Sequence, residues 1–98
     1  MKPRFLLPAR QELADAVRYY NAQRAGLGGE FADEARSALG RIVDFPFSWH
    51  PMGGAIRRCQ MRRFPYGLIY EPWEDRGEIV VIAVANLHQK PDYWRNRR

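Results

Sequence analysis

The longest regular hydrophobic pattern in this sequence lies between residues 27 and 45 and has the period of an α-helix. Its apolar side chains follow one another at steps of four, four, three, four and three residues: Leu27, Phe31, Ala35, Ala38, Ile42 and Phe45. These steps are close to one helical turn of 3.6 residues, so they place the side chains on one face. Pro46 follows directly, and proline cannot continue a helix. The spacing therefore predicts an amphipathic helix over 27–45.

A second helical pattern precedes this one. Pro8 suits the first turn of a helix, where its missing N–H costs no hydrogen bond. The segment 8–25 then places Leu13, Val17 and Tyr20 at helical spacing. Glycines crowd the positions immediately after it and interrupt the pattern. We therefore expect two helices that fold back on each other as an antiparallel αα-hairpin.

After a loop at 47–54 the period of the apolar residues changes from helical spacing to alternation. Alternate residues over 64–70 are apolar, which predicts a strand with one buried face, and 56–61 mixes apolar and basic residues as an exposed strand does. Residues 78–85 are apolar on both faces, as in a central strand covered on both sides. With a short apolar stretch at 5–7, the predicted fold is α+β, of order β-α-α-β-β-β. The αα-hairpin packs on one face of a largely antiparallel four-stranded sheet.

Composition restricts the domain organisation. A chain of 98 residues with 46% hydrophobic residues has room for one domain, over 1–98, and is too apolar to be disordered. Its single cysteine excludes an internal disulfide and a cysteine-based zinc site. No apolar run approaches the roughly 20 residues of a membrane span. No signal peptide pattern is present either, so we expect a cytoplasmic protein.

The charge of the chain points to an anionic partner. Sixteen basic residues against eleven acidic ones give a net charge of +5, and all but two of the basic residues are arginine. Arginine binds planar carboxylates and phosphates through a rigid fork of N–H donors. The excess is largest in the second half of the chain, which suggests binding to nucleic acid or to an acidic protein segment. The alternative is a surface that is charged only for solubility.

Four arginines next to the predicted middle strands form the first candidate site: Arg57, Arg58, Arg62 and Arg63. On a continuous strand, alternation would place Arg58 and Arg62 on one face, and Arg57 and Arg63 on the other. A sheet with helices on one face has a second face free, and an arginine pair there would bind phosphates. The alternative is a solvated strand whose cations prevent edge pairing.

The basic and aromatic tail, residues 91–98, forms the second candidate site. Tyr93 and Trp94 could stack on nucleobases while Arg95 and the two arginines after it hold phosphates. Equally, Trp94 could pack onto the sheet as a C-terminal latch. Among possible acid–base groups we favour His88, because imidazoles exchange protons near neutral pH. No glycine-rich phosphate loop, metal-ligand cluster or nucleophile motif is present, so we predict no cofactor and no metal site.

Several fragments, in this order and at this spacing, make the chain similar to a known group of proteins. They are ARQELADA at 9–16 followed by Tyr19 and Tyr20, GLGGEF at 26–31, RRFPYGLIY at 62–70 and PDYW at 91–94. Together they span almost the whole chain, which resembles the RelE/ParE superfamily of bacterial type II toxins. The resemblance implies the β-α-α-β-β-β core predicted above.

The resemblance also implies a growth-inhibiting toxin encoded beside an acidic antitoxin protein. The flexible C-terminal segment of such an antitoxin wraps the toxin, and operator DNA is bound only through the complex of the two. An acidic segment would form charge-assisted hydrogen bonds with the arginines. The residues expected to bind antitoxin or target are Arg57, Arg58, Arg62, Arg63, Tyr93, Trp94 and Arg95.

The resemblance leaves the cellular target open between DNA gyrase and the ribosome with its mRNA. ParE-like members inhibit gyrase, whereas RelE-like members cut mRNA in the ribosomal A site. If this chain is an mRNA endoribonuclease, Arg58 and Arg62 would stabilise the charge of the reacting phosphate, and His88 or Tyr93 would move the proton.

Three departures from the RelE-like pattern weaken the nuclease alternative. Asn86 follows the last strand where many relatives have a histidine, and Gln89 and Lys90 stand where they have two arginines. An amide cannot transfer a proton at neutral pH. The paired glycines and the Phe-Pro-Tyr run are closer to ParE, so we favour a ParE-like toxin that does not cleave RNA and leave open whether the chain is an enzyme. A third possibility is an inert member that binds antitoxin and serves only regulation.

Overall fold

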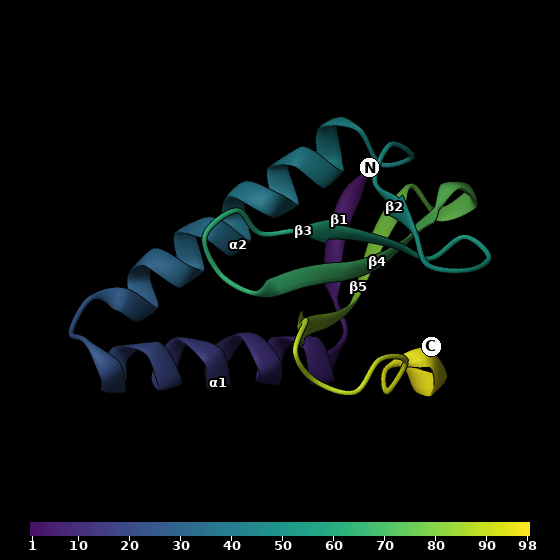
Figure 1. The fold of residues 1–98 in the computed structure, drawn as a ribbon. Coiled ribbons are helices and arrows are strands. Elements are labelled where there is room, and N and C mark those ends of the chain that lie inside the picture. The colour runs from purple at the N-terminus through teal and green to yellow at the C-terminus, as the bar shows by residue number, and fades with distance from the viewer.

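The computed structural model describes all 98 residues and consists of two helices packed on a mixed five-stranded sheet (Figure 1). The elements in chain order are β1 (Lys2–Phe5), α1 (Leu7–Gln23), α2 (Leu27–Asp44), β2 (His50–Pro51), β3 (Arg57–Gln60), β4 (Tyr66–Trp73) and β5 (Glu78–Asn86), with short 3-10 turns at Glu74–Arg76 and Arg95–Arg97. The strand order is β1-β5-β4-β3-β2. Only β1 and β5 run parallel. The predicted α+β class and the helical hairpin are confirmed.

The number of strands is the first correction. The two residues of β2 pair with β3 inside the segment predicted as a loop, and they make a fifth strand. A two-residue strand is too short to show any alternation, so the sequence pattern has no signal for it. The predicted first strand, 5–7, is also displaced, because β1 ends at Phe5 and α1 begins at Leu7. The polar residues of β1 fit its place at the edge of the sheet.

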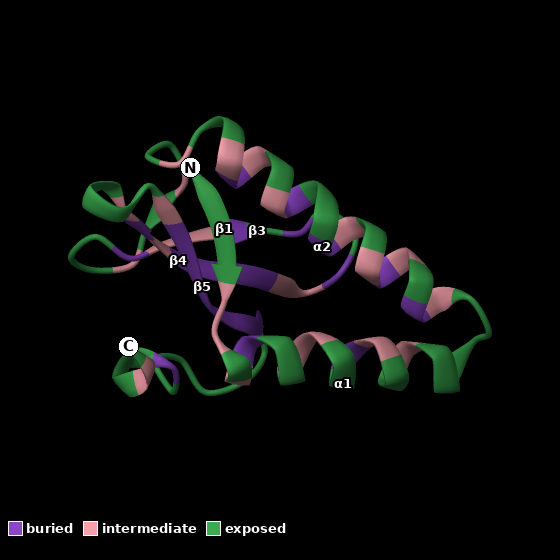
Figure 2. Cartoon of the chain, turned by 180° about the vertical axis from the view of Figure 1, so that it is seen from behind, coloured by how far each residue is buried: buried purple, intermediate pink, exposed green.

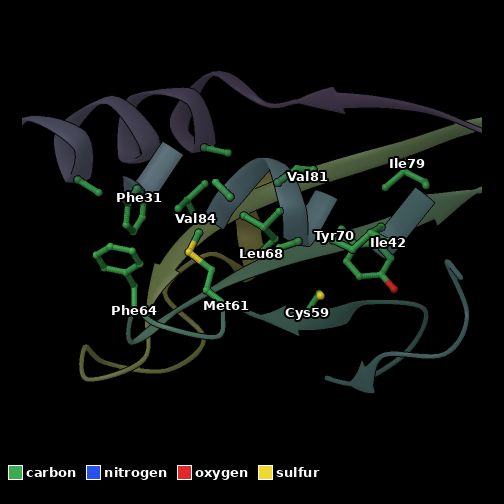
Figure 3. Close-up of a cluster of buried hydrophobic side chains, with 14 residues drawn as sticks. Phe31, Ile42, Cys59, Met61, Phe64, Leu68, Tyr70, Ile79, Val81 and Val84 are labelled. Carbon is green, nitrogen blue, oxygen red and sulfur yellow. The ribbon is translucent and has the colours of Figure 1, made fainter. Parts of the chain in front are cut away.

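The main core lies between the helices and the sheet (Figure 3). Phe31 and Ile42 of α2 are completely buried there, together with Leu68 and Tyr70 of β4. The Tyr70 hydroxyl donates a hydrogen bond to the carbonyl oxygen of Pro46 at 2.6 Å. Burial raises the pKa of Tyr70 to about 12. The stripe predicted on α2 is thus the face that packs on the sheet.

A second, smaller cluster covers the opposite face of the sheet. Its buried members are Ile56, Ile69, Ile82, Ala83, Ala85 and Trp94. Strand β5 contributes to both clusters and is buried along its centre, as the apolar run at 78–85 predicts. A β-bulge helps it to do so, because Tyr70 pairs with Val81 while Ile69 pairs with Ala83. Neither helix is long and apolar enough to cross a membrane.

The helices of the hairpin approach each other closely at Gly28. Its backbone N–H donates to Oδ1 of Asn21 at 2.8 Å. A Cβ atom at this position would lie 2.4 Å from the carbonyl oxygen of Val17, which is backbone and cannot move aside cheaply. A Cβ atom at the adjacent Gly29 would contact nothing within 4 Å.

The two glycines provide a matched test of the hairpin. We expect Gly28→Ala to lower the free energy of unfolding by about 1–3 kcal/mol, because the helices must separate. Gly29→Ala should leave stability unchanged or raise it by up to about 1 kcal/mol, because alanine favours helix. Urea denaturation of both variants measures the difference. Equal losses would contradict the close approach of the helices at Gly28.

Candidate functional site

The C-terminal segment, residues 91–98, packs on the sheet face opposite the helices. Trp94 is 2% exposed and lies in the cluster with Ile69 and Ile82. Figure 2 shows a buried stretch in the C-terminal tail, among exposed and intermediate stretches. The latch predicted for Trp94 is confirmed, and its ring is therefore not available for stacking on nucleobases. Tyr93 keeps 38% of its surface exposed.

The carboxylate of Glu12 on α1 forms hydrogen bonds with both the C-terminal tail and strand β5. Its Oε1 atom accepts hydrogen bonds from the Val84 N–H of β5 at 3.0 Å and from Nη1 of Arg97 at 2.8 Å. Its Oε2 atom accepts from the Tyr93 hydroxyl at 2.8 Å and from Nη2 of Arg97 at 2.9 Å. Arg97 Nη1 also donates to the carbonyl oxygen of Ile82 at 3.1 Å. The pairing of β1 with β5 ends at Val81. After that point, the side chains of Glu12 and Arg97 form hydrogen bonds with the backbone N–H of Val84 and the carbonyl oxygen of Ile82.

This arrangement keeps the Tyr93 hydroxyl protonated. Burial, and next the hydrogen bond to Glu12, raise the pKa of Tyr93 far above its usual value. The same carboxylate raises the pKa of Arg97. A phenol that already donates to a carboxylate and resists ionisation is a poor general base at neutral pH.

Arg62 and Arg63 lie beyond the end of β3, so the alternation expected on a continuous strand does not reach them. Oε1 of Glu34 accepts hydrogen bonds from both of their backbone N–H groups, each at 3.2 Å, and the chain bends there. The Arg63 guanidinium pairs with Glu30 at 2.8 Å and lowers the pKa of that carboxyl. Arg63 thus contacts α2, and Arg62 is exposed beside it.

Arg57 and Arg58 remain on β3 and point to opposite faces of the sheet. Cys59 is buried in the helix-side cluster, so Arg57, two residues earlier, is on that side and Arg58 is on the other. Nη1 of Arg57 donates to the carbonyl oxygen of Trp49 at 3.0 Å. The four arginines therefore do not form one surface. Of the four, only Arg58 lies on the face that the tail covers.

Arg58 lines a small hollow of about 80 Å³ between the sheet and the tail. Its other lining residues are Met52, Ile69, Ala85, Asn86, Leu87, Gln89, Lys90, Pro91, Asp92, Tyr93 and Trp94. Arg95 lies at its edge, where its Nη2 donates to the carbonyl oxygen of Met52 at 2.6 Å and its Nε pairs with Asp92 at 3.0 Å. The structure thus gathers Arg58, Tyr93, Trp94 and Arg95 from the predicted site residues.

His88 belongs to a neighbouring cavity, which shares Asn86 and Gln89 with the hollow. It lines an open cleft of about 760 Å³ between α1 and the ends of β4 and β5, together with Glu12, Tyr19 and Tyr66. Arg58 does not line this cleft, and Arg62 lines neither cavity. Of the residues considered for RNA cleavage, Arg58 and Tyr93 therefore line the hollow, His88 lines the cleft, and Arg62 lines neither. No three His, Cys, Asp or Glu side chains lie close enough together to bind a metal ion.

Sequence reasoning missed Glu12 and Gly67, which lies against the Arg58 side chain, and it expected Arg97 to hold phosphates rather than to bind Glu12. Glu12 and Arg97 are 85 positions apart, and no periodic pattern reports such a contact. One weak signal for Glu12 is its place next to the apolar stripe of α1. Gly67 interrupts the predicted alternating strand, which is a known mark of close approach by another group.

Comparison with known proteins supplies the family. The model of the family described as ParE toxin of type II toxin-antitoxin system, parDE, matches residues 4–93. A solved chain of the chromosomal ParDE TA system from P. aeruginosa is similar with a TM-score of 0.67 at 12% identity, over 89% of this chain and 96% of that chain. At this identity the structural match shows the fold alone. No curated protein matches the chain. Because the family model spans nearly every helix and strand, the chain belongs to the ParE toxin family of type II toxin-antitoxin systems.

Proposed function

We propose that this protein stops growth by inhibiting DNA gyrase, that it does so without cleaving RNA, and that an acidic antitoxin neutralises it. The observation that supports the proposal most is the match of residues 4–93 to the ParE family. Inhibition of gyrase is what a ParE-like toxin is expected to do. It requires a binding surface and no catalytic group.

The placement of the nuclease candidates supports a mechanism without hydrolysis. Cleavage at a 2′-hydroxyl needs a base, an acid and cations around one phosphate. Here Arg58 and His88 line different cavities, and the Tyr93 hydroxyl is bound to Glu12. The ribosome would have to bring Arg58 and His88 together, or free the Tyr93 hydroxyl from Glu12, before either pair could act on one phosphate.

The distribution of charge supports an acidic partner. Arg58, Lys90 and Arg95 all lie around the hollow between the sheet and the tail, in a chain with a net charge of +5. An acidic segment that crosses this face would be attracted from a distance and would form charge-assisted hydrogen bonds. The tail face is therefore our proposed antitoxin surface, and Arg57 and Arg63, which have partners within the chain, lie outside it.

Expression in cells tests the proposal. Induction without antitoxin should stop growth and trigger the DNA-damage response while messages stay whole. Co-expression of the antitoxin from the neighbouring reading frame should restore growth. Unchanged growth on induction would identify an inert regulatory member, and cuts in messages at fixed codon positions would identify a RelE-like nuclease.

A reaction with purified components separates the mechanisms further. We expect mRNA on programmed ribosomes to remain intact in the presence of the protein, and His88→Ala to behave like the unaltered chain. A nuclease that used His88 would instead cut the message, and the substitution would slow cutting by about 100-fold or more. Mapping the message ends by primer extension measures the outcome.

A further inference from the structure

Arg58 is a half-buried cation without a partner inside the chain. Its side chain forms no hydrogen bond and no ion pair, whereas Arg57, Arg63 and Arg95 all bind an oxygen atom of the protein. Partly buried charged groups are ordinarily paired, because burial costs them hydration. The guanidinium of Arg58 is therefore free to bind an anion from outside.

The methylene groups of the Arg58 side chain lie against Gly67, which has no side chain to displace them. A Cβ atom at position 67 would lie 3.0 Å from Cγ of Arg58 and 3.2 Å from its Cδ. The methylene groups of Arg58 thus lie directly against the backbone of β4, in space that any other residue would fill. Arg58 lies here beside the tail residues that line the hollow with it.

The hollow beside Arg58 has the size and walls for a single acidic side chain. Its volume of about 80 Å³ exceeds the roughly 10–15 Å³ that one water molecule needs, so the hollow has room for a small charged group. Met52, Ile69 and Trp94 give it apolar walls, and Lys90 adds a second cation. Asp92 also lines the hollow, but its carboxylate forms an ion pair with Arg95 and not with Arg58.

We propose that this hollow binds the carboxylate of one glutamate side chain of the antitoxin, an inference that rests on the proposed function. The carboxylate would accept two parallel hydrogen bonds from the Arg58 guanidinium. The methylene groups of the glutamate would contact the apolar walls at Met52 and Trp94. A nucleic-acid phosphate fits less well, because its polar sugars match these apolar walls less well than methylene groups do.

Calorimetric titration of the purified protein with the antitoxin of the neighbouring reading frame tests the subsite. Arg58→Ala should weaken binding about 10- to 100-fold, as expected for a desolvated charge pair. Arg36→Ala removes the same charge from an exposed ion pair on α2, and we expect it to change affinity less than about twofold. Thermal denaturation should show Arg58→Ala to be folded and nearly as stable as the unaltered chain.

Gly67→Ala examines the geometry without a change of charge. The added methyl group displaces the Arg58 stem by a few tenths of an ångström or more, and we expect affinity to fall by about fivefold or more. Arg58→Lys also keeps the charge but lacks the fork of donors, so it should bind about tenfold more weakly. Substituting antitoxin glutamates one at a time by glutamine should identify one that loses its effect when Arg58 is already alanine.

The outcomes distinguish this inference from the proposed function. If the unaltered protein does not bind the antitoxin, the proposed function fails. If it binds tightly and Arg58→Ala matches Arg36→Ala, the function stands and the subsite is overturned. If Arg58→Ala instead abolishes binding of an RNA oligonucleotide and leaves antitoxin affinity intact, the site takes phosphate and the inference is equally overturned.

Discussion

Replacing Phe31 with alanine should lower the free energy of unfolding by about 3–5 kcal/mol. The Phe31 ring is completely buried and contacts the rings of Tyr20, Phe64 and Tyr66 at centroid distances of 5.3, 5.1 and 4.9 Å. It therefore joins α1, α2 and the start of β4. Removal of the ring would leave a cavity. The surrounding side chains belong to separate, well-packed elements, so they could fill this cavity only in part.

Phe45 provides the control for this prediction. It is the last apolar residue of the stripe that predicted the second helix. However, α2 ends at Asp44 and Phe45 is 61% exposed, so the sequence pattern was wrong in placing Phe45 on the buried face. We expect Phe45→Ala to cost less than about 1 kcal/mol. Urea denaturation measures both variants. Similar losses for Phe31→Ala and Phe45→Ala would mean that the aromatic cluster is not the centre of the core.

Replacing Glu12 with alanine should have the second-largest effect, a loss of about 2–4 kcal/mol. The substitution leaves the Tyr93 hydroxyl, the Arg97 guanidinium and the Val84 N–H without their shared acceptor. The ion pair is mostly sheltered, with 22% of the Glu12 side chain exposed and 19% of Arg97. Glu12→Gln keeps one acceptor oxygen and should lose less.

The same variants report on the tail. Without Glu12 the segment 91–98 should detach more often, so trypsin should cleave after Arg95 sooner in Glu12→Ala than in the unaltered chain. Asp33→Ala is the control, because Asp33 forms an exposed ion pair with Arg36 on α2. Denaturation and timed proteolysis measure the two effects. If Asp33→Ala and Glu12→Ala behaved alike, Glu12 would not be fastening the tail.

The elements that could be predicted from the sequence are those with local, repeated patterns. The stripe on α2 and the apolar run of β5 show which surfaces are buried, because their periods reflect burial directly. The strand β2 and the exact start of α1 could not be predicted, since each depends on one or two residues.

The candidate site was harder to predict than the fold. Alternation describes Arg57 and Arg58 correctly but fails for Arg62 and Arg63, because β3 ends before them and their backbone N–H groups bind Glu34 where the chain bends. That interaction joins residues 28 positions apart and has no local signature. The free sheet face expected for the arginines is instead partly covered by Trp94. The cations on that face are Arg58 and those of the tail.

Inhibition of purified DNA gyrase is the most direct test of the proposed function. We expect the protein to block the supercoiling of relaxed plasmid in proportion to its concentration, and equimolar antitoxin to restore it. Full supercoiling activity at an excess of folded protein, with or without antitoxin, would contradict the account.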